Sequence, residues 1–418
     1  MDSICLNRVE VNRNLVKFYY SVSEGLKRYF NSDVMFLEYE QDMSAVPLSI
    51  LTIPFVSCMA GLSWLSNSML FVDEIDRSFY DSFFRIKRAY QELHYDLSLL
   101  GLLVPSKFTN NVVAKSNNSL LLFGGGVDCH CSFLRNQDSI CRICSINGWL
   151  NSPTDINDVD ILNKKAAGDF AKANNVDCSY VRTNFSAQFN NAVVNKVFKT
   201  SYWYVFLHSM AFISISIPLC YANNISNIII ASSFTKNRID VMCSSLITTD
   251  SEFAFSTNGC VIHDGYELNR QQKVGLLVNY QKESQKPYPI NVCSFHDKNC
   301  NECEKCFRTV LAIVAEGGDP RDFGFNCDIP LKEHWEAILE REIGLWGVEK
   351  EDYYYYCFTR KRMNQNYDNI QDKDFADWFL HLDLQRLKKI GVINYYKKNF
   401  FSIILRKLFH INISRHKC

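Results

Sequence analysis

The feature that most restricts the fold of this chain is an alternation of short apolar runs and longer helical patterns that begins at Ser119. The strand-like runs lie at Ser119–Phe123, Ser139–Ile146, Val176–Val181 and Asn227–Ala231, and the clearest helical pattern is Asp158–Asn174. An unbroken apolar run is typical of a strand that is buried on both faces of a sheet. Strands that alternate with helices of this length are joined by parallel crossovers. The sequence therefore predicts an α/β fold with a doubly wound parallel sheet.

Three consecutive glycines follow the first of these strands. Gly124, Gly125 and Gly126 come directly after the apolar run, and a helix is expected to begin near Asp128. Glycines leave backbone N–H groups open to an anion, and the N-terminus of a helix adds partial positive charge. Ligands of open parallel sheets also bind outside the carboxyl ends of the strands. The turn is therefore predicted to bind a nucleotide phosphate, and a tight turn without a ligand is the alternative.

Four cysteines in the second half of the chain have the spacing of metal ligands. The chain has 17 cysteines, and its start (MDSICLNRVEVNRN) lacks the apolar stretch of a signal peptide. A cytoplasmic location is therefore expected, where clustered cysteines indicate a metal site. Cys293, Cys300, Cys303 and Cys306 follow a Cys-x6-Cys-x2-Cys-x2-Cys pattern. Four thiolates suit a tetrahedral zinc and leave no open position, so a structural zinc is predicted. The alternatives are a redox or iron–sulfur site, four unrelated cysteines, and His296 as a competing ligand.

The glycine turn also resembles a known nucleotide-binding loop. The segment LLLFGGGVDCHCSF is similar to the pyrophosphate-binding loop of the N-type ATP pyrophosphatases, whose pattern is strand, Ser-Gly-Gly-x-Asp-Ser, helix. Gly125, Gly126 and Asp128 match this pattern, whereas Gly124 and Cys129 replace its two serines. Losing two hydroxyl donors to a phosphate would cost about 3–6 kcal/mol if nothing replaced them. Phosphate binding by the backbone is therefore a safer expectation than turnover.

Together, the loop and the cysteine cluster make residues 119–316 resemble the 7-cyano-7-deazaguanine synthase family. This resemblance implies ATP, Mg²⁺ and Zn²⁺ as cofactors and a small-molecule or carboxylate substrate that is adenylated and then captured by ammonia or an amine. Asp128 would organise Mg²⁺ or the loop. The alternative is a degenerate module that binds a nucleotide or a modified base, with a protein partner in a biosynthetic or phage-defence assembly.

Two further groups of polar residues are candidate site residues. Ser232 and Ser233 end the fourth strand and would either contact the nucleotide or cap the turn. Arg270 and Lys273 are predicted to hold a phosphate or a substrate carboxylate, because guanidinium and ammonium groups bind such anions well. At three-residue spacing they would share a helix face with Glu267. The alternative is a solvent-exposed face of ion pairs.

The pattern divides the chain into three regions. Residues 1–112 form a mixed N-terminal α+β unit, residues 113–320 the ATP pyrophosphatase-like domain with its zinc site, and residues 321–418 a helical, basic C-terminal region. Within the first region, Leu48–Ile53 is typical of a strand. The apolar segment Tyr204–Ala222 is long enough to cross a membrane, but its histidine, serines and proline favour a buried helix.

The charge balance gives few clues to a partner. The chain has 45 basic and 45 acidic side chains, so no overall field indicates nucleic acid or an acidic partner. The tail differs, because no acidic residue follows Asp383 and basic residues alternate there with aromatic and aliphatic ones. Such a tail predicts contact with an anionic membrane surface or a partner. A terminal helix packed on its own domain is the alternative.

Overall fold

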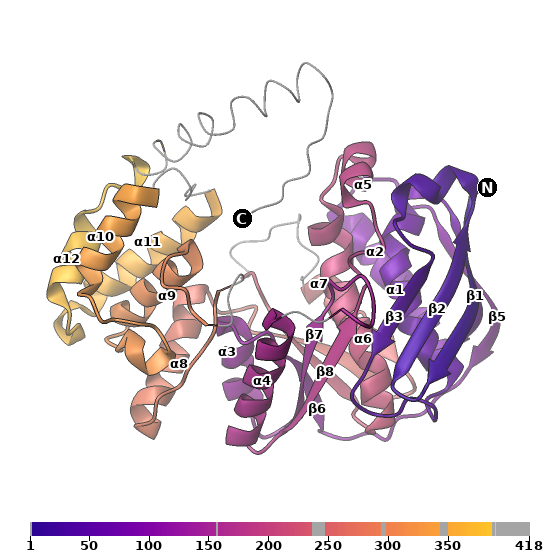
Figure 1. Ribbon diagram of the computed structural model, residues 1–418, viewed down its shortest axis with the longest axis horizontal. Helices are drawn as coiled ribbons and strands as arrows, with labels where there is room; N and C mark the ends of the chain where they lie inside the picture. The colour runs from indigo at the N-terminus through magenta and orange to yellow at the C-terminus, as the bar shows by residue number, and fades with distance from the viewer. Residues whose placement is uncertain are drawn as a thin grey trace. The chain divides into compact units, whose positions relative to one another are not determined.

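The protein forms two compact units. The computed structural model describes residues 2–155, 158–235, 247–293, 298–342, 350–386 and 389. The first unit comprises Met1–Gly124 and Ser132–Glu267, and the second comprises Gly125–Cys131 and Leu268–Cys418 (Figure 1). The second unit therefore takes a short piece from the middle of the chain, which contains most of the glycine turn.

The first unit is built on one sheet of 11 strands in the order β10-β11-β9-β6-β7-β8-β3-β2-β1-β4-β5. Strands β11, β9, β6, β7 and β8 form one parallel block, and β1, β4 and β5 form another. Antiparallel pairing through β2 and β3 joins the two blocks. The strands are β1 (Ser3–Asn12), β2 (Leu15–Val22), β3 (Val34–Glu38), β4 (Met69–Asp76), β5 (Leu102–Thr109), β6 (Ser119–Leu122), β7 (Ile140–Asn147), β8 (Asp177–Thr183), β9 (Asn227–Ala231), β10 (Ala254–Phe255) and β11 (Gly259–Asp264).

The strand order of the larger parallel block shows where a ligand of such a sheet would be expected to bind. From β6 the chain adds β7 and then β8 on one side, and afterwards β9 and then β11 on the other side. The winding direction thus reverses between β6 and β9, and ligands of such sheets bind outside the carboxyl ends of the strands at this point. The prediction of an α/β fold with a large, mostly parallel sheet is confirmed, and the strand order is compatible with a doubly wound fold.

Helices cover both faces of this block. Leu120 belongs to the core that packs against α1 and α6, whereas the ring of Phe123 stacks on Phe170 of α4 with centroids 4.6 Å apart. Successive residues of a strand point to opposite faces, so α4 lies on the face opposite α6. The helices described in this unit, with the one shared between the units, are α1 (Leu48–Ser66), α2 (Arg77–Leu93), α3 (Val127–Asn136), α4 (Asp158–Ala173), α5 (Asn191–Phe198), α6 (His208–Ala222) and α7 (Ile247–Asp250), with a 3-10 turn at Glu24–Tyr29 and a π-helical turn at Trp203–Leu207.

Among the described residues, two helices of the first unit are apolar enough to cross a membrane, and both are mostly buried. In Leu48–Ser66 and Trp203–Ala222, 89% and 78% of the most apolar window is buried. The prediction of a buried helix at Tyr204–Ala222 is confirmed, and this burial is the pattern of a soluble protein. The strand predicted at Leu48–Ile53 is wrong, because these residues begin α1. A helix buried on all sides lacks an apolar stripe, so periodicity alone does not separate it from a buried strand.

The N-terminal residues belong to the same sheet as the glycine-turn strand. Strand β3 pairs with β8 through Leu37 opposite Thr183 and Glu38 opposite Arg182. Residues 1–112 therefore share a compact unit with β6 to β11, and the predicted boundary at 112 falls within this unit.

The second unit is helical and has an aromatic core. Phe307 of α9 lies at its centre, with ring centroids 5.1 Å from Trp335, 5.9 Å from Tyr356 and 6.4 Å from Phe379. These rings come from three different helices, so residues after 320 pack with the cysteine cluster in one unit. Its helices, orange and yellow towards the end of the chain in Figure 1, are α8 (Arg270–Ser284), α9 (Glu304–Ala315), α10 (Leu331–Glu342), α11 (Lys350–Gln365) and α12 (Lys373–His381), with 3-10 turns at Pro320–Phe323 and Tyr367–Asn369. Most of the basic tail lies outside the described residues.

Candidate functional site

The glycine turn is open around its backbone. It leads from β6 into α3, which begins at Val127. Gly125 has φ +75°, a left-handed conformation that glycine adopts without steric cost. In the part of the chain that the structure describes, a Cβ added at Gly124 would have no atom within 4 Å, and at Gly125 or Gly126 the nearest atom, from Asn291, is 3.9 Å away. A small anion could therefore approach the amides of this turn.

The three residues predicted to be catalytic lie together in the second unit. The Asp128 carboxylate is 2.9 Å from Lys273 Nζ and 2.8 Å from an Arg270 guanidinium nitrogen. Both cations come from the first turn of α8, which Asn269 and Gln272 close with a capping box. Burial of Asp128 disfavours its charge, but the adjacent Lys273 and Arg270 charges outweigh this effect and lower its pKa. Lys273 is only 3% exposed, so these side chains are not a solvent-exposed face of ion pairs.

Helix α9 carries two further cations, Arg308 and Lys305, whose pKa effects link them to Asp128 and Arg270. Arg308 pairs with Glu304 at 3.3 Å and lies 4.7 Å from the ring centroid of Tyr355. Its charge also helps to lower the pKa of Asp128. Lys305 has a lowered pKa because of burial and the like charges of Arg308 and Arg270, while the Cys303 thiol acts in the opposite direction. Lys305 is therefore within reach of the charges of both the α8–α9 cations and the cysteine cluster.

Three of the four predicted metal ligands lie around one point, and the fourth, Cys306, lies beside two of them. The Sγ atoms of Cys293, Cys300 and Cys303 all lie within 4.8 Å of one another. Cys306 Sγ is 3.5 Å from that of Cys303 and 3.9 Å from that of Cys300. Zinc–sulfur bonds of about 2.3 Å give a tetrahedron with edges of about 3.8 Å, so these distances fit a bound ion. The close contact with the Cys306 side chain lowers the pKa of Cys303 to about 5. His296, the alternative ligand, lies outside the described residues.

Hydrogen bonds hold the backbone segments next to the cysteines in place. Asn299 accepts from the N–H of Val292 at 2.9 Å and donates to the carbonyl of Ile290 at 2.9 Å. Cys303 is the N-cap of α9, and its carbonyl accepts from the N–H of Phe307 at 3.0 Å. Ligands oriented in this way bind a metal with little rearrangement.

Asn291 connects the cysteine cluster to the glycine turn. Its N–H donates to the carbonyl of Gly125 at 2.9 Å, and its side-chain oxygen accepts from the N–H of Cys293 at 3.1 Å. Neither Asn291 nor Lys305 was predicted from the sequence. The only sequence signal for either residue is its position beside or within the cysteine motif.

Cys129 and His130 face the protein interior. Cys129 is 7% exposed, and its Sγ lies 3.1 Å from the carbonyl of Gly126, the residue before α3. His130 is 2% exposed and contacts the hydroxyl of Tyr288 at 3.2 Å. Burial lowers the pKa of His130 to about 3, so its ring is neutral at pH 7.

Ser232 and Ser233 belong to the first unit, at the carboxyl end of β9. Ser232 is fully buried, its hydroxyl donates to the carbonyl of Phe234 at 2.7 Å, and its N–H donates to the carbonyl of Asp264 at 2.8 Å. Ser233 is exposed. Ser232 thus caps the turn after β9, which is one of its two predicted roles.

Glu267 does not share a helix face with Arg270 and Lys273, so this prediction is wrong. It precedes Asn269, the N-cap of α8, and pairs instead with Arg135 of α3 in the first unit. Residues before the N-cap do not have helical backbone angles, so their side chains do not continue the spacing of the helix.

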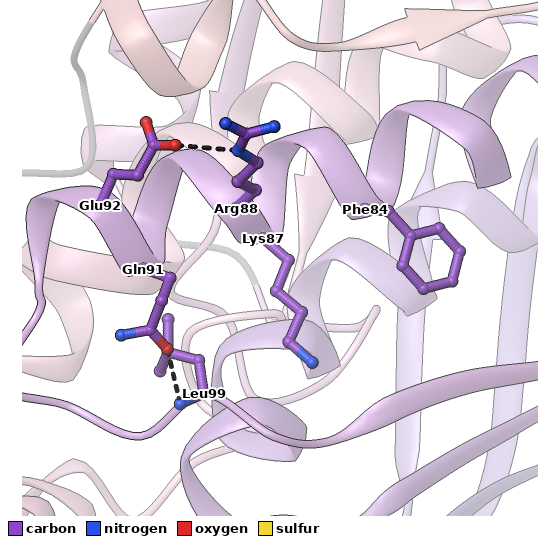
Figure 2. A pocket seen from close by; sticks show the side chains of 6 residues that line it. All are labelled: Phe84, Lys87, Arg88, Gln91, Glu92 and Leu99. Carbon is purple, nitrogen blue, oxygen red and sulfur yellow. Dashed lines mark hydrogen bonds and ion pairs between the residues drawn. The ribbon is translucent and has the colours of Figure 1, made fainter.

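One surface pocket lies away from all of these residues. It has a volume of about 360 Å³ and lies along α2 in the first unit (Figure 2). Arg88 pairs with Glu92 at 2.9 Å, and the Gln91 side chain accepts from the N–H of Leu99 at 3.0 Å. Since these polar groups bond to one another, the pocket does not indicate a catalytic or ligand-binding site. Its lining residues are Phe84, Lys87, Arg88, Gln91, Glu92 and Leu99.

Comparisons with protein-family models, with curated proteins and with solved structures found no match. The function of this protein is therefore inferred from the geometry of its own residues.

Proposed function

We propose that the glycine turn binds the phosphates of ATP and that the protein is an adenylating ligase that forms carbon–nitrogen bonds. The observation that carries this proposal is an open Gly-Gly turn at a helix N-terminus with two cations, Arg270 and Lys273, on the acidic residue of its first turn. Backbone amides, a helix N-terminus and fixed cations are the groups that stabilise a leaving pyrophosphate.

In the proposed reaction a substrate carboxylate oxygen attacks the α-phosphorus, and the bond from this phosphorus to the pyrophosphate oxygen breaks. An amine or ammonia then attacks the activated carbonyl, loses a proton and displaces AMP. Arg270 and Lys273 balance the charge of pyrophosphate, and Asp128 keeps both cations beside the turn. Mg²⁺ bound with the nucleotide would supply further positive charge.

The strand order supports the same proposal. The sequence β8-β7-β6-β9-β11 corresponds to the order 3-2-1-4-5 of nucleotide-binding doubly wound sheets. We assign the parallel block to the adenine nucleotide α-hydrolase-like class on this basis, and the glycine turn follows its central strand.

The cysteine cluster is proposed to hold a structural zinc. Four thiolates fill a tetrahedral zinc completely, which leaves no position for a substrate. The site is followed directly by α9, whose Phe307 is central to the second unit. Zinc would therefore fix the start of a core helix.

Exchange of labelled pyrophosphate into ATP tests the ligase. With a panel of carboxylates, the zinc-loaded protein is expected to incorporate label with the correct acid. Lys273→Gln should reduce the exchange roughly 10- to 100-fold, since a hydrogen bond to a charged group contributes about 1.5–3 kcal/mol. Lys286→Gln, at an exposed lysine of the same unit, is the matched control. Full exchange by Lys273→Gln would exclude this lysine from the phosphate site.

One observation favours a second function, a nucleotide-binding module without turnover. Gly124 has no hydroxyl, and the Cys129 thiol is buried against the carbonyl of Gly126. Neither position of the two replaced serines can therefore donate to a phosphate. Such a module would bind ATP but exchange no label with any carboxylate, and the double change Gly124→Ser with Cys129→Ser would be expected to tighten nucleotide binding.

A further inference from the structure

The cysteine cluster and the glycine turn share one hydrogen-bonded connection. Asn291 uses its backbone N–H on the carbonyl of Gly125 and its side-chain oxygen on the N–H of Cys293, the first cysteine of the cluster. All of these groups belong to the second unit. A change at one site can therefore reach the other through a single residue.

At the turn, this contact sets the direction of an amide. A trans peptide is planar, and its C=O and the following N–H point in opposite directions. Asn291 holds the Gly125 carbonyl on one side, and the His130 ring also bonds the Gly125 backbone. The N–H of Gly126 must then point away from Asn291, to the side on which an anion would approach.

At the cysteine cluster, the same residue is held by the ligand backbone. Asn299 fixes the N–H of Val292, and Asn291 fixes that of Cys293. A metal bound to the Cys293 thiolate would restrain this backbone further, because the ligand must keep its position relative to the other three thiolates. Without the metal, Cys293 loses this restraint and so does the side chain of Asn291.

We propose that Asn291 is a positioning residue that couples the two sites, so that pyrophosphate binds more tightly to the zinc-loaded protein than to the metal-free protein. The inference depends on the proposed phosphate site. Coupling of this kind is reciprocal, so pyrophosphate raises the affinity for zinc by the same factor. The glycine turn is thereby expected to bind an anion more tightly in protein whose cysteine cluster is filled.

The experiment measures two affinities in the full chain by titration calorimetry, with inorganic pyrophosphate and Zn²⁺ as the probes. In the wild-type protein, zinc should tighten pyrophosphate binding roughly 5- to 150-fold, the usual range of coupling between sites. Asn291→Ala keeps the N–H that bonds Gly125 but removes the acceptor for Cys293. Both probes should still bind to this variant, with a coupling factor close to one.

Two further variants separate coupling from general damage. Asn291→Asp keeps a side-chain acceptor for Cys293, so the coupling factor should persist even though the added charge weakens pyrophosphate binding with and without zinc. Asn364→Ala removes an exposed asparagine of α11 and should behave as the wild type. A measurement confined to zinc-loaded protein covers the case in which the metal-free chain unfolds. There, Asn291→Ala should weaken pyrophosphate binding several-fold and speed hydrogen exchange of the amides of residues 125–127, with zinc content unchanged.

The outcomes distinguish the inference from the function on which it depends. No pyrophosphate binding by the zinc-loaded wild type would overturn the proposed function itself. Equal pyrophosphate affinity with and without zinc would leave that function intact and overturn the coupling. If Asn291→Ala kept the wild-type coupling factor, Asn291 would not connect the two sites. The same conclusion would follow if zinc-loaded Asn291→Ala kept the wild-type pyrophosphate affinity and hydrogen-exchange rate.

Discussion

Burial fixes the charge of His130, a ring beside the glycine turn. Its pKa is lowered to about 3, whereas an unfolded histidine titrates near 6.5. Between these values the unfolded chain binds a proton that the folded chain does not, so acidification from about pH 6.5 to 3 lowers the free energy of unfolding. The His130 ring signals in NMR spectra should therefore not shift between pH 8 and 5. A titration midpoint near pH 6.5 would contradict the buried position.

Asp128 has the same direction of pH dependence in a more acidic range, because its pKa is also lowered in the folded chain. Since its folded pKa is lowered, its contribution to stability is complete above the unfolded pKa of about 3.8 and is lost as pH falls through the lower folded value. Asp128→Asn should lower the free energy of unfolding by about 1–3 kcal/mol at pH 7. This difference from the wild type should shrink below about pH 4, as followed by urea unfolding at several pH values. Asp138→Asn, at an exposed carboxylate, should show no such difference at any pH.

Residue spacing anticipated part of this site. Arg270 and Lys273 are three positions apart, and in α8 both reach Asp128. The spacing did not identify Asp128 as their partner, because 142 residues separate Asp128 from Arg270 and only the fold brings them together. Asn291 was missed for a related reason, since one of its two contacts is a backbone contact that any residue type could make.

The strands around the glycine turn were predictable because each is an apolar run that is bounded by polar residues. β9 has the predicted bounds Asn227–Ala231, and β6 ends one residue before the predicted end. Helix α1 was not predictable as a helix, since 16 of its 19 residues are buried and no polar face marks the helical period.

Glycine substitutions separate the turn's fold from its proposed ligand. Gly124→Ala adds a methyl group that meets no atom within 4 Å, so its free energy of unfolding should stay within about 0.5 kcal/mol of the wild type. The same methyl group would lie beside the phosphate and should weaken pyrophosphate binding. Gly125→Ala is the comparison, because a residue with a Cβ at φ +75° should cost about 1–2 kcal/mol. Urea unfolding and calorimetry together give both quantities, and unchanged binding by Gly124→Ala would place the anion elsewhere.

The cysteine cluster should determine the order of the first turn of α9. Cys306→Ser replaces a fully buried residue that is proposed as a zinc ligand, so the zinc content should fall well below one ion per chain. Hydrogen exchange in Glu304–Arg308 should accelerate, since the thiolates hold this turn. Cys357→Ser, at an exposed cysteine of α11, is the matched control and should keep its zinc. Full zinc content in Cys306→Ser would show that three cysteines and another group suffice.

The division of the chain into two units could not be predicted from local patterns. Gly125–Cys131 joins Leu268–Cys418 through ion pairs and hydrogen bonds with residues more than 100 positions away. The N-terminal strands likewise join the central sheet through the pairing of β3 with β8, residues far apart in the chain. Patterns of hydrophobicity identify elements, but not which distant elements pair.

This division gives the last prediction, on metal removal. The cysteines belong to the second unit, whereas the sheet with its buried helices α1 and α6 belongs to the first. A ligand that binds only the folded state stabilises that state by mass action, so a zinc chelator should lower the melting temperature of the second unit. The melting temperature of the first unit should fall less, because α3 is the described helix that has residues in both units. Calorimetry with and without chelator, followed by limited proteolysis at an intermediate temperature, should reveal cleavage within Leu268–Cys418 before cleavage of the strands. Zinc added back should restore the protection of Leu268–Cys418 against proteolysis, whereas Mg²⁺, the control ion, should not. A uniform loss of protection across both units would instead mean that the metal stabilises the molecule as one cooperative whole.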